Sequence, residues 1–327
     1  MAGPTHVPVL LEATLDLLEP ERGGCYVDCT VGLGGHAVAL LERAPTATLI
    51  GIDRDLEALA ESERRLERFA DRVTLLEGRF SDLAVLLATR GVERVAGMLA
   101  DLGVSSLQLD RGERGFAFSR PGPLDMRMGG EGMSARDIVN TYSEDALARI
   151  FHEYGEERQS RRIARAIARR RTEAPIDSTA ELAELVERIK GPASHHKTRA
   201  PRARRRSQGG RPSRSLRTHP ATQVFQALRI EVNQELDELD QLLDQATTLL
   251  ESGGKLVVIS YHSLEDGMVK HRFRALDHGE VDPVTGAPRS ETQLVETLTK
   301  KPLRPSDDEV EINPRARSAR MRAVRKR

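Results

Sequence analysis

The chain has 327 residues, a formal net charge of +0, 39% hydrophobic residues and only 3% aromatic residues. This composition supports an aliphatic core for one large domain or two modest ones. No apolar stretch approaches 18 residues, and acidic residues interrupt the first apolar run. We therefore expect neither a membrane span nor a signal peptide, and a cytoplasmic protein.

The balanced net charge hides a strong asymmetry. Residues 1–110 hold 18 acidic and 10 basic residues. Three later segments are basic and contain no acid: Arg158 to Arg171, Ala193 to Arg217 and Ile312 to Arg327. Such clusters favour a polyanionic partner, and therefore nucleic acid. For each segment taken alone, a solvated helix face or a disordered tail explains the charge equally well.

The first hundred residues alternate apolar runs with amphipathic segments. The pattern predicts an open, mostly parallel α/β sheet. The expected strands are 25–29, 48–53, 73–76 and 95–101, and the expected helices are 34–44, 55–70 and 81–89.

The alternation stops near residue 105 and resumes more than a hundred residues later. A Gly-rich loop, Arg111 to Gly132, is followed by expected helices near 144–152, 156–171 and 178–190. Thr218-His-Pro220 then opens one long helix whose apolar stripe runs to Leu250, and Lys255 to Tyr261 is an expected fifth strand. We predict a sheet domain formed by 1–106 and 219–327, interrupted by a helical insertion, 107–218. Residues 193–217 carry almost no apolar side chains, so we expect disorder there.

The most informative run is Cys25-Tyr-Val-Asp-Cys-Thr-Val-Gly-Leu-Gly-Gly-His36. It reads as a buried strand, a glycine turn and the start of a helix, which is the entry to a nucleotide pocket. Asp53 ends the second strand 21 positions after Gly32, close to the spacing at which a carboxylate binds ribose hydroxyls. The two cysteines, Cys25 and Cys29, lie too far apart on one strand for a disulfide.

Three features favour S-adenosylmethionine over NAD in this pocket. Asp28 lies within the first strand, where a carboxylate can meet a cationic amino-acid group. Phe80 follows the third strand, where an aromatic ring can cover an adenine. Asp101 ends the fourth strand, where reacting groups meet in open α/β sheets.

Nine sequence blocks together resemble one family. They are His6-Val-Pro-Val-Leu-Leu, Asp28-x-Thr-x-Gly-x-Gly-Gly-His36, Gly51-Ile-Asp-Arg-Asp55, Asp101-Leu-Gly-Val-Ser-Ser-x-Gln108, Arg114-Gly-Phe-x-Phe118, Pro123-Leu-Asp-Met-Arg-Met128, Tyr154-Gly-Glu-Glu-Arg158, His219-Pro-Ala-Thr-x-x-Phe-Gln-Ala-Leu-Arg-Ile230 and Ser260-Tyr-His-Ser-Leu-Glu-Asp266. The chain is similar through them to the RsmH (MraW) family, whose members methylate the N4 of a cytidine in 16S ribosomal RNA. The resemblance runs from His6 to about Arg274 and returns at the basic C-terminus.

The resemblance implies a Rossmann-like class I methyltransferase sheet that uses S-adenosyl-L-methionine. It implies 16S ribosomal RNA within the small ribosomal subunit as the partner, and it leaves room for a homodimer. It puts the cofactor on seven residues: Gly34, Gly35, His36, Asp53, Phe80, Asp101 and Gln108. For His36, we expect backbone contact with the ligand rather than side-chain chemistry.

The remaining site candidates come from the position of the residues after the fourth and fifth strands. We expect Asp101 and Ser105 to be catalytic. Phe116, Phe118 and Tyr261 are the candidates for stacking on cytosine. A role in packing alone would also account for each of these rings. Ser106 and His262 are polar candidates for orienting the base. No His/Cys/Asp cluster has the spacing of metal ligands, so we expect no metal.

Two other functions remain open from the sequence. An NAD-dependent dehydrogenase fits the formal pattern Gly32-x-Gly34-x-x-Ala37, although the basic runs count against it. A non-catalytic ribosome-assembly factor on the same scaffold fits the basic runs, although the cofactor loop is intact.

Overall fold

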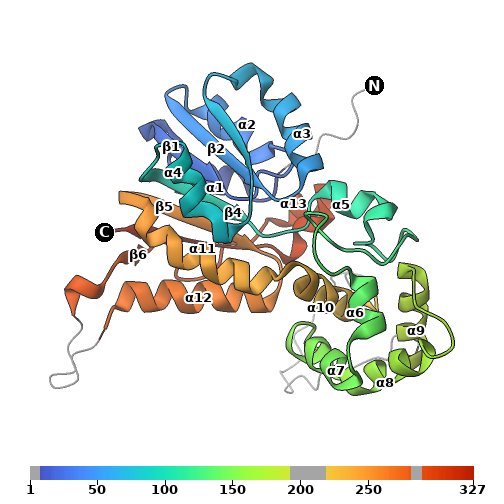
Figure 1. Ribbon diagram of the computed structural model, residues 1–327. Coiled ribbons are helices and arrows are strands. Elements are labelled where there is room, and N and C mark those ends of the chain that lie inside the picture. Colours follow the sequence, from blue (N-terminus) through green and yellow to red (C-terminus); the bar gives the residue numbers. More distant parts are fainter. Residues whose placement is uncertain (1–7, 192–218, 281–288) are drawn as a thin grey trace, which may run out of the picture. The chain divides into compact units, whose positions relative to one another are not determined.

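The computed structural model describes residues 8–191, 219–280 and 289–327. These residues form two compact units (Figure 1). The first, called the sheet unit here, comprises the described residues of 1–107, 128–130 and 234–327. The second, the helical unit, comprises those of 108–127 and 131–233. The expected basic loop, 193–217, lies outside the described residues.

A seven-stranded sheet in the order β3-β2-β1-β4-β5-β7-β6 forms the centre of the sheet unit. The strands are β1 (Gly24–Asp28), β2 (Ala47–Asp53), β3 (Val73–Glu77), β4 (Val95–Asp101), β5 (Leu250–Ser260), β6 (Val295–Thr297) and β7 (Arg320–Lys326). The first five are parallel, and β7 is antiparallel to both of its neighbours. The predicted mixed α/β sheet is confirmed, and β6 and β7 extend it beyond the five expected strands.

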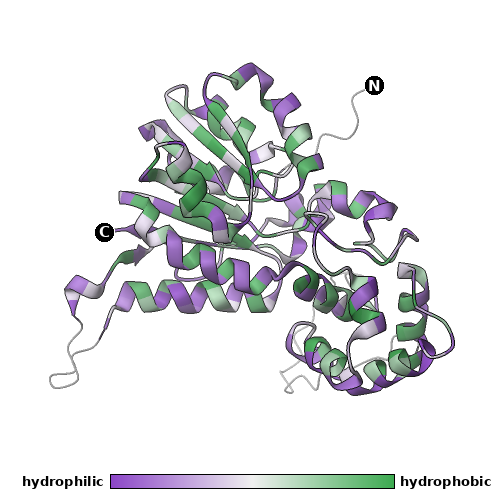
Figure 2. Ribbon diagram, viewed as in Figure 1, coloured by the Kyte–Doolittle hydropathy of each residue, from purple (hydrophilic) through white to green (hydrophobic). Residues whose placement is uncertain are grey.

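Helices pack against both faces of this sheet. They are α1 (Leu11–Leu18), α2 (Gly35–Arg43), α3 (Leu56–Leu66), α4 (Leu83–Thr89), α11 (Glu235–Leu249) and α12 (Ser263–His278); the short α13 (Asp307–Ile312) also belongs to the sheet unit but buries none of its residues. One buried cluster joins the sheet to α4, α11 and α12, and another joins it to α1, α2 and α3. Figure 2 shows the strands as largely hydrophobic and α11 and α12 as mixed along their length, as expected for helices with one face on a core.

The basic C-terminal segment is part of this sheet. Strand β7 pairs with β5 from Lys255↔Arg325 to Ser260↔Arg320. Its alternate residues Met321 and Ala323 are fully buried, while Arg322 Nε donates a 2.6 Å hydrogen bond to Asp266 Oδ1. The interpretation of this run as a disordered tail is therefore wrong, and much of its charge is paired within the protein.

The helical unit consists mainly of α6 (Ala135–Thr141), α7 (Glu144–Glu153), α8 (Ser160–Arg170), α9 (Thr179–Lys190) and α10 (Thr222–Asn233). The short α5 (Ser106–Asp110) lies at the boundary between the units. Its core includes the aromatic Phe151 beside the aliphatic Ile163, Ile167, Val186 and Leu228. The expected helix over 156–171 begins only at Ser160, because Glu156 adopts a left-handed conformation with φ 50°.

The single long helix expected between Thr218 and Leu250 is wrong. The chain forms α10 and α11, separated by Gln234 with φ 52°. The buried Asn233 side chain donates hydrogen bonds to the carbonyls of Met126 and Arg229, at 2.8 and 3.0 Å. The two halves of the apolar stripe serve different cores, so residues 219–233 group with the helical unit rather than with the sheet.

Within the described residues, no helix combines the length and the apolar character needed to cross a membrane.

Candidate functional site

Three carboxylates end three adjacent strands of the sheet unit. Asp53, Asp28 and Asp101 are the last residues of β2, β1 and β4. Strand β1 lies between the other two, with Asp28 opposite Gly51 on one side and Leu99 on the other. The direction in which the chain adds strands reverses between β1 and β4. The carboxyl edge at such a switch point is where open α/β sheets bind ligands.

The glycine turn after β1 depends on backbone conformations that glycine adopts without strain. Gly32 has φ 52° and Gly34 has φ 75°, and Gly34 is the N-cap of α2. The backbone N–H of Gly32 donates to Asp53 Oδ2 at 2.9 Å, and the Ser62 hydroxyl donates to the Gly32 carbonyl at 2.6 Å. The turn is therefore held in place from β2 and α3.

At Gly35 the reason for glycine is different: the N-terminal segment packs so close to its backbone that a side chain has no room. A Cβ at Gly35 would lie 2.6 Å from Cγ of Pro8. The same segment places the Val9 carbonyl 3.0 Å from Nε2 of His36. Its next residue, Leu10, donates its backbone N–H to Glu309 Oε1 of α13 at 2.7 Å. The cofactor roles predicted for Gly34 and Gly35 stay predictions.

The Asp53 carboxylate is held by two backbone donors. Besides Gly32, the N–H of Asp55 donates to Asp53 Oδ1 at 2.9 Å. Burial raises the pKa of Asp53 to about 6, although both N–H groups favour the ionised form. Phe80 begins the turn after β3 and packs, partly buried, against the core. Gly78, two residues earlier, donates its N–H to the Asp53 carbonyl at 3.0 Å.

Asp28 is the most deeply buried of the three carboxylates, at 3% exposure. The N–H of Thr30 donates to its Oδ1 at 3.1 Å. Burial, together with the neighbouring charges of Asp101 and Asp53, raises the pKa of Asp28 to about 7. A cation placed at this edge of the sheet would favour the ionised carboxylate.

This raised pKa predicts how stability changes with pH. The folded protein keeps the Asp28 proton up to about pH 7, whereas the unfolded chain releases it near 3.8. The contribution of Asp28 to stability therefore falls as pH rises between these values and is constant above them. We expect Asp28→Asn to stabilise the protein at pH 8, by at most about 4 kcal/mol. The gain should vanish near pH 4.

Urea unfolding of the wild type and Asp28→Asn from pH 5 to 8 measures this difference. Asp71→Asn, which alters an exposed carboxylate, is the matched control. A stability difference between wild type and Asp28→Asn that stayed constant over this range would contradict the buried, protonated carboxyl.

Asp101 has partners from three parts of the sheet unit. Its Oδ1 accepts a 2.8 Å hydrogen bond from the hydroxyl of Tyr261, which follows β5. Its Oδ2 lies 4.0 Å from Nδ1 of His36, at the start of α2. Its backbone N–H donates to the Thr30 hydroxyl at 2.7 Å. The structure therefore brings Asp101 and His36 together. The family resemblance had implied only that both residues belong to the cofactor site.

Tyr261 is positioned as a partner of Asp101. A Cβ at Gly103 would lie 2.7 Å from the Tyr261 ring, so the chain after β4 passes directly over that ring. Glu265 Oε2 accepts the backbone N–H of Tyr261 at 2.8 Å. Burial and the Asp101 charge raise the pKa of Tyr261 well above its usual value, so its hydroxyl stays protonated and donates. Sequence reasoning considered only the ring of this residue and missed its hydroxyl.

The other sequence candidates are spread over both units. Ser105 lies in the loop after β4, and Ser106 opens α5. Gln108 is buried in α5 and groups with the helical unit, as do Phe116 and Phe118. Phe118 stacks on His219, with ring centroids 4.2 Å apart, and contacts Phe225 edge-on. One face of the Phe118 ring is thus already used in packing.

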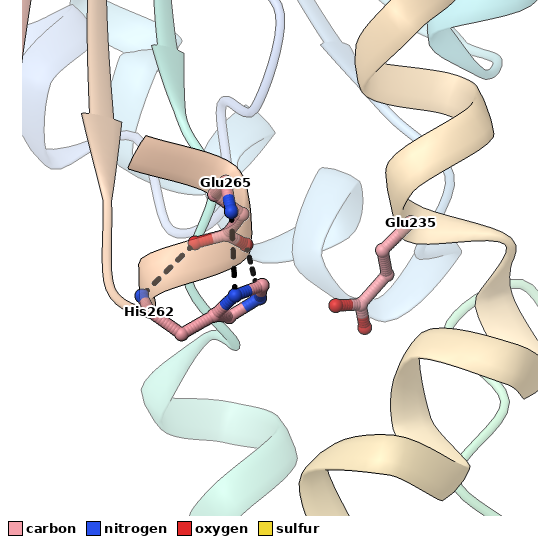
Figure 3. Close-up of side chains that lie close together, drawn as sticks. All are labelled: Glu235, His262 and Glu265. Atoms are coloured by element: carbon pink, nitrogen blue, oxygen red, sulfur yellow. Dashed lines mark hydrogen bonds and ion pairs between the residues drawn. The ribbon is translucent and has the colours of Figure 1, made fainter. Parts of the chain in front are cut away.

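His262 belongs to a cluster with Glu265 and Glu235, whose ligand atoms lie within 4.8 Å of one another (Figure 3). His262 caps the N-terminus of α12: its Nδ1 accepts the N–H of Glu265 at 3.4 Å. The proton of the neutral ring is therefore on Nε2, 3.0 Å from Glu265 Oε1. Metal binding at Nε2 would require the opposite tautomer. Helix capping accounts for Nδ1, whereas Nε2 is buried without a hydrogen-bond partner in the part of the chain that the structure describes.

The strand order and the glycine turn define a Rossmann-like α/β protein. The chain belongs to the MraW methylase family, whose model matches residues 3–327. It is 47% identical to "Ribosomal RNA small subunit methyltransferase H" of Pelobacter propionicus over 100% of both chains. It is 45% identical to the protein of the same name from Magnetococcus marinus over 98% of both.

Among solved structures, an rRNA methylase from Streptococcus thermophilus aligns with 98% of this chain and 99% of its own. The TM-score is 0.41 and the sequence identity 10%, which is too low a similarity to support a structural argument.

Proposed function

We propose that the protein transfers a methyl group from S-adenosyl-L-methionine to the N4 amino group of a cytidine in 16S ribosomal RNA of the small ribosomal subunit. The observation that carries this proposal is the meeting of Asp28, Asp53 and Asp101 at one edge of the sheet, beside a left-handed glycine turn. Family membership supports the methyl transfer, and the names of the relatives support the ribosomal RNA substrate.

The residues at this edge fit the chemistry of S-adenosylmethionine. Asp53 already accepts two backbone N–H bonds, which orient its oxygens and leave lone pairs for ribose hydroxyls. The partly buried ring of Phe80 offers an apolar surface for an adenine. The carboxyl groups of Asp28 and Asp101 supply negative charge for a ligand that carries a sulfonium and an ammonium group.

When bound, the cofactor supplies an electrophilic methyl carbon, which the N4 lone pair attacks while the carbon–sulfur bond breaks. The protein's part is to hold N4 in line and to accept its protons. Asp101 is suited to this because Tyr261 fixes one carboxylate oxygen by a hydrogen bond. The expected role of Ser105 is to orient the base from the loop that follows.

The direct experiment incubates the purified protein with labelled S-adenosylmethionine and small-subunit particles from cells that lack the gene. Mass spectrometry of the digested RNA should show N4-methylcytidine at one position. Retention of NAD without any methyl transfer would favour a dehydrogenase. Particle binding without transfer or cofactor retention would favour a non-catalytic assembly factor.

We further propose that the helical unit recognises RNA. Arg161, Arg165 and Arg169 lie exposed on α8, opposite the buried Ile163 and Ile167. Of these three arginines, Arg165 forms an ion pair with Glu144, with its Nε 3.2 Å from Glu144 Oε1. A row of guanidinium groups along one helix face suits a phosphate backbone.

Reversing Arg161 and Arg165 to Glu should weaken binding to small-subunit particles by about tenfold or more, and should make the salt dependence shallower. Methylation at limiting substrate should fall in parallel, while cofactor affinity stays unchanged. The matched control reverses Arg64 and Arg90, which are exposed on the sheet unit. Equal losses in both double variants would show a general charge effect and defeat the assignment.

A further inference from the structure

His36 is a buried histidine that lies beside Asp101, near the carboxylate oxygen that Tyr261 does not bind. It is 8% exposed, and it occupies the second position of α2, directly after the glycine turn. Its Nε2 lies 3.0 Å from the Val9 carbonyl oxygen, and its Nδ1 lies 4.0 Å from Asp101 Oδ2. The imidazole therefore bridges the N-terminal segment and the strand-end carboxylate.

These two contacts determine which nitrogen carries the proton. A carbonyl oxygen only accepts hydrogen bonds, so Nε2 must be the donor toward Val9. In the neutral ring, Nδ1 then has a bare lone pair 4.0 Å from a carboxylate oxygen of Asp101. Nδ1 and Asp101 Oδ2 are then two acceptors close together, which is unfavourable. A proton on Nδ1 converts this contact into an imidazolium–carboxylate ion pair.

We propose that His36 is the proton acceptor behind Asp101: it takes up, through that carboxylate, the proton that the methylated amino group releases. This proposal rests on the proposed methyl transfer and adds a step to it. His36 acts through Asp101 and is therefore a positioning and relay residue rather than one that touches the base.

The proton balance of the step is complete. Once N4 has formed its bond to the methyl carbon, the nitrogen carries a positive charge and one proton too many. That N–H bond breaks toward Asp101 Oδ2, and the nitrogen keeps the electron pair. The Asp101 proton then passes to Nδ1 of His36, which leaves a carboxylate beside an imidazolium. The imidazolium returns its proton to solvent after the product leaves.

The surroundings keep His36 neutral before the reaction. Burial lowers the pKa of His36, whereas the charge of Asp101, the Val9 carbonyl and the charge of Glu309 on α13 oppose that shift. Asp28 lines the same small cavity as His36, from the β1 side. The His36 imidazole is thus uncharged at rest, and the Asp101 carboxylate, which stabilises the imidazolium, is already in place.

The resting tautomer can be measured without any catalysis. In a nitrogen-15 histidine spectrum of the full-length protein, we expect His36 to show a protonated Nε2 and an unprotonated Nδ1. In Asp101→Asn, the pKa of the imidazole should fall, because the carboxylate that favours its charged form is gone. A protonated Nδ1, or an imidazole that does not respond to Asp101→Asn, would overturn the proposal even if every other variant failed to fold.

The kinetic test uses His36→Gln, whose amide can still donate to the Val9 carbonyl but cannot accept a proton. We expect the single-turnover methylation rate to fall about 100-fold at saturating cofactor. Cofactor affinity from calorimetry should change by less than about threefold, as expected when only transition-state interactions are lost. The dependence of the rate on pH below 7 should also change shape relative to the wild type.

Two controls separate the outcomes. Asp28→Asn identifies the part of the pH dependence that belongs to the neighbouring buried carboxyl. Tyr261→Phe removes the other hydrogen bond to Asp101 and should lower the rate without changing the shape of the profile. If His36→Gln matched the wild type in rate and profile, the relay would be wrong and the methyl transfer would still stand. If the wild type itself transferred no methyl group, the proposed function would be wrong.

Discussion

Asp101→Asn should lower the single-turnover rate of methyl transfer by about 10²–10³-fold while cofactor affinity falls by less than about tenfold. Asparagine has nearly the same size as aspartate. Its carbonyl oxygen can still accept the Tyr261 hydroxyl, now bonded to Oδ1 at 2.8 Å. Its amide nitrogen can donate toward Nδ1 of His36, which lies 4.0 Å from Oδ2. The substitution therefore preserves the local contacts and removes the charge and the proton acceptor.

The comparison of rate with affinity decides what Asp101 does. A carboxylate that interacts mainly with the transition state affects the rate far more than the binding of the cofactor. Glu93→Gln, which neutralises an exposed carboxylate two residues before β4, is the matched control. A wild-type rate in Asp101→Asn would make Asp101 a structural residue, and both the mechanism and the His36 relay would fail with it.

Local signals in the sequence were sufficient to place the five parallel strands and the glycine turn. Buried parallel strands are short, apolar and bounded by glycine or polar residues, so their limits are visible in the chain itself. The left-handed Gly32 and Gly34 and the strand-end Asp53 follow from the same logic. These features depend on residues within about twenty positions of one another.

The sequence did not predict features that depend on tertiary contacts. Gln234 breaks a helix without glycine or proline, and the break exists because α10 and α11 pack into different cores. Strand β7 reads as a basic tail because the run Ile312 to Arg327 has seven basic residues and no acidic one. Only the pairing with β5, and the contact of Arg322 with Asp266, make it a strand of the sheet.

The candidate site shows the same division. Asp28, Asp53 and Asp101 could be predicted as a group because the carboxyl ends of parallel strands meet at one edge. The side-chain contacts of His36 and Tyr261 could not. They depend on the Val9 carbonyl and on the chain at Gly103, each of which is distant in sequence from the residue that it contacts.

Asp53→Ala should reduce the affinity for S-adenosylmethionine by about 10- to 150-fold. The estimate corresponds to the loss of charge-assisted hydrogen bonds worth roughly 1.5–3 kcal/mol. The structure adds a second reason. Asp53 Oδ2 accepts the N–H of Gly32 at 2.9 Å, so alanine also removes the support of the glycine turn. Titration calorimetry measures the change, and an unchanged affinity would remove Asp53 from the site.

Asp53→Asn separates the two reasons. Asparagine keeps one acceptor for the backbone N–H groups but cannot ionise. The affinity of Asp53→Asn for S-adenosylmethionine should therefore lie between those of the wild type and Asp53→Ala. Burial raises the pKa of Asp53 to about 6, and the ionised carboxylate is the better acceptor for ribose hydroxyls. Wild-type affinity should therefore rise with pH between about 5 and 7, more steeply than the affinity of Asp53→Asn. Parallel pH profiles for the two proteins would mean that the titrating acceptor is a different residue, and the buried carboxyl of Asp28 would then be the first to test.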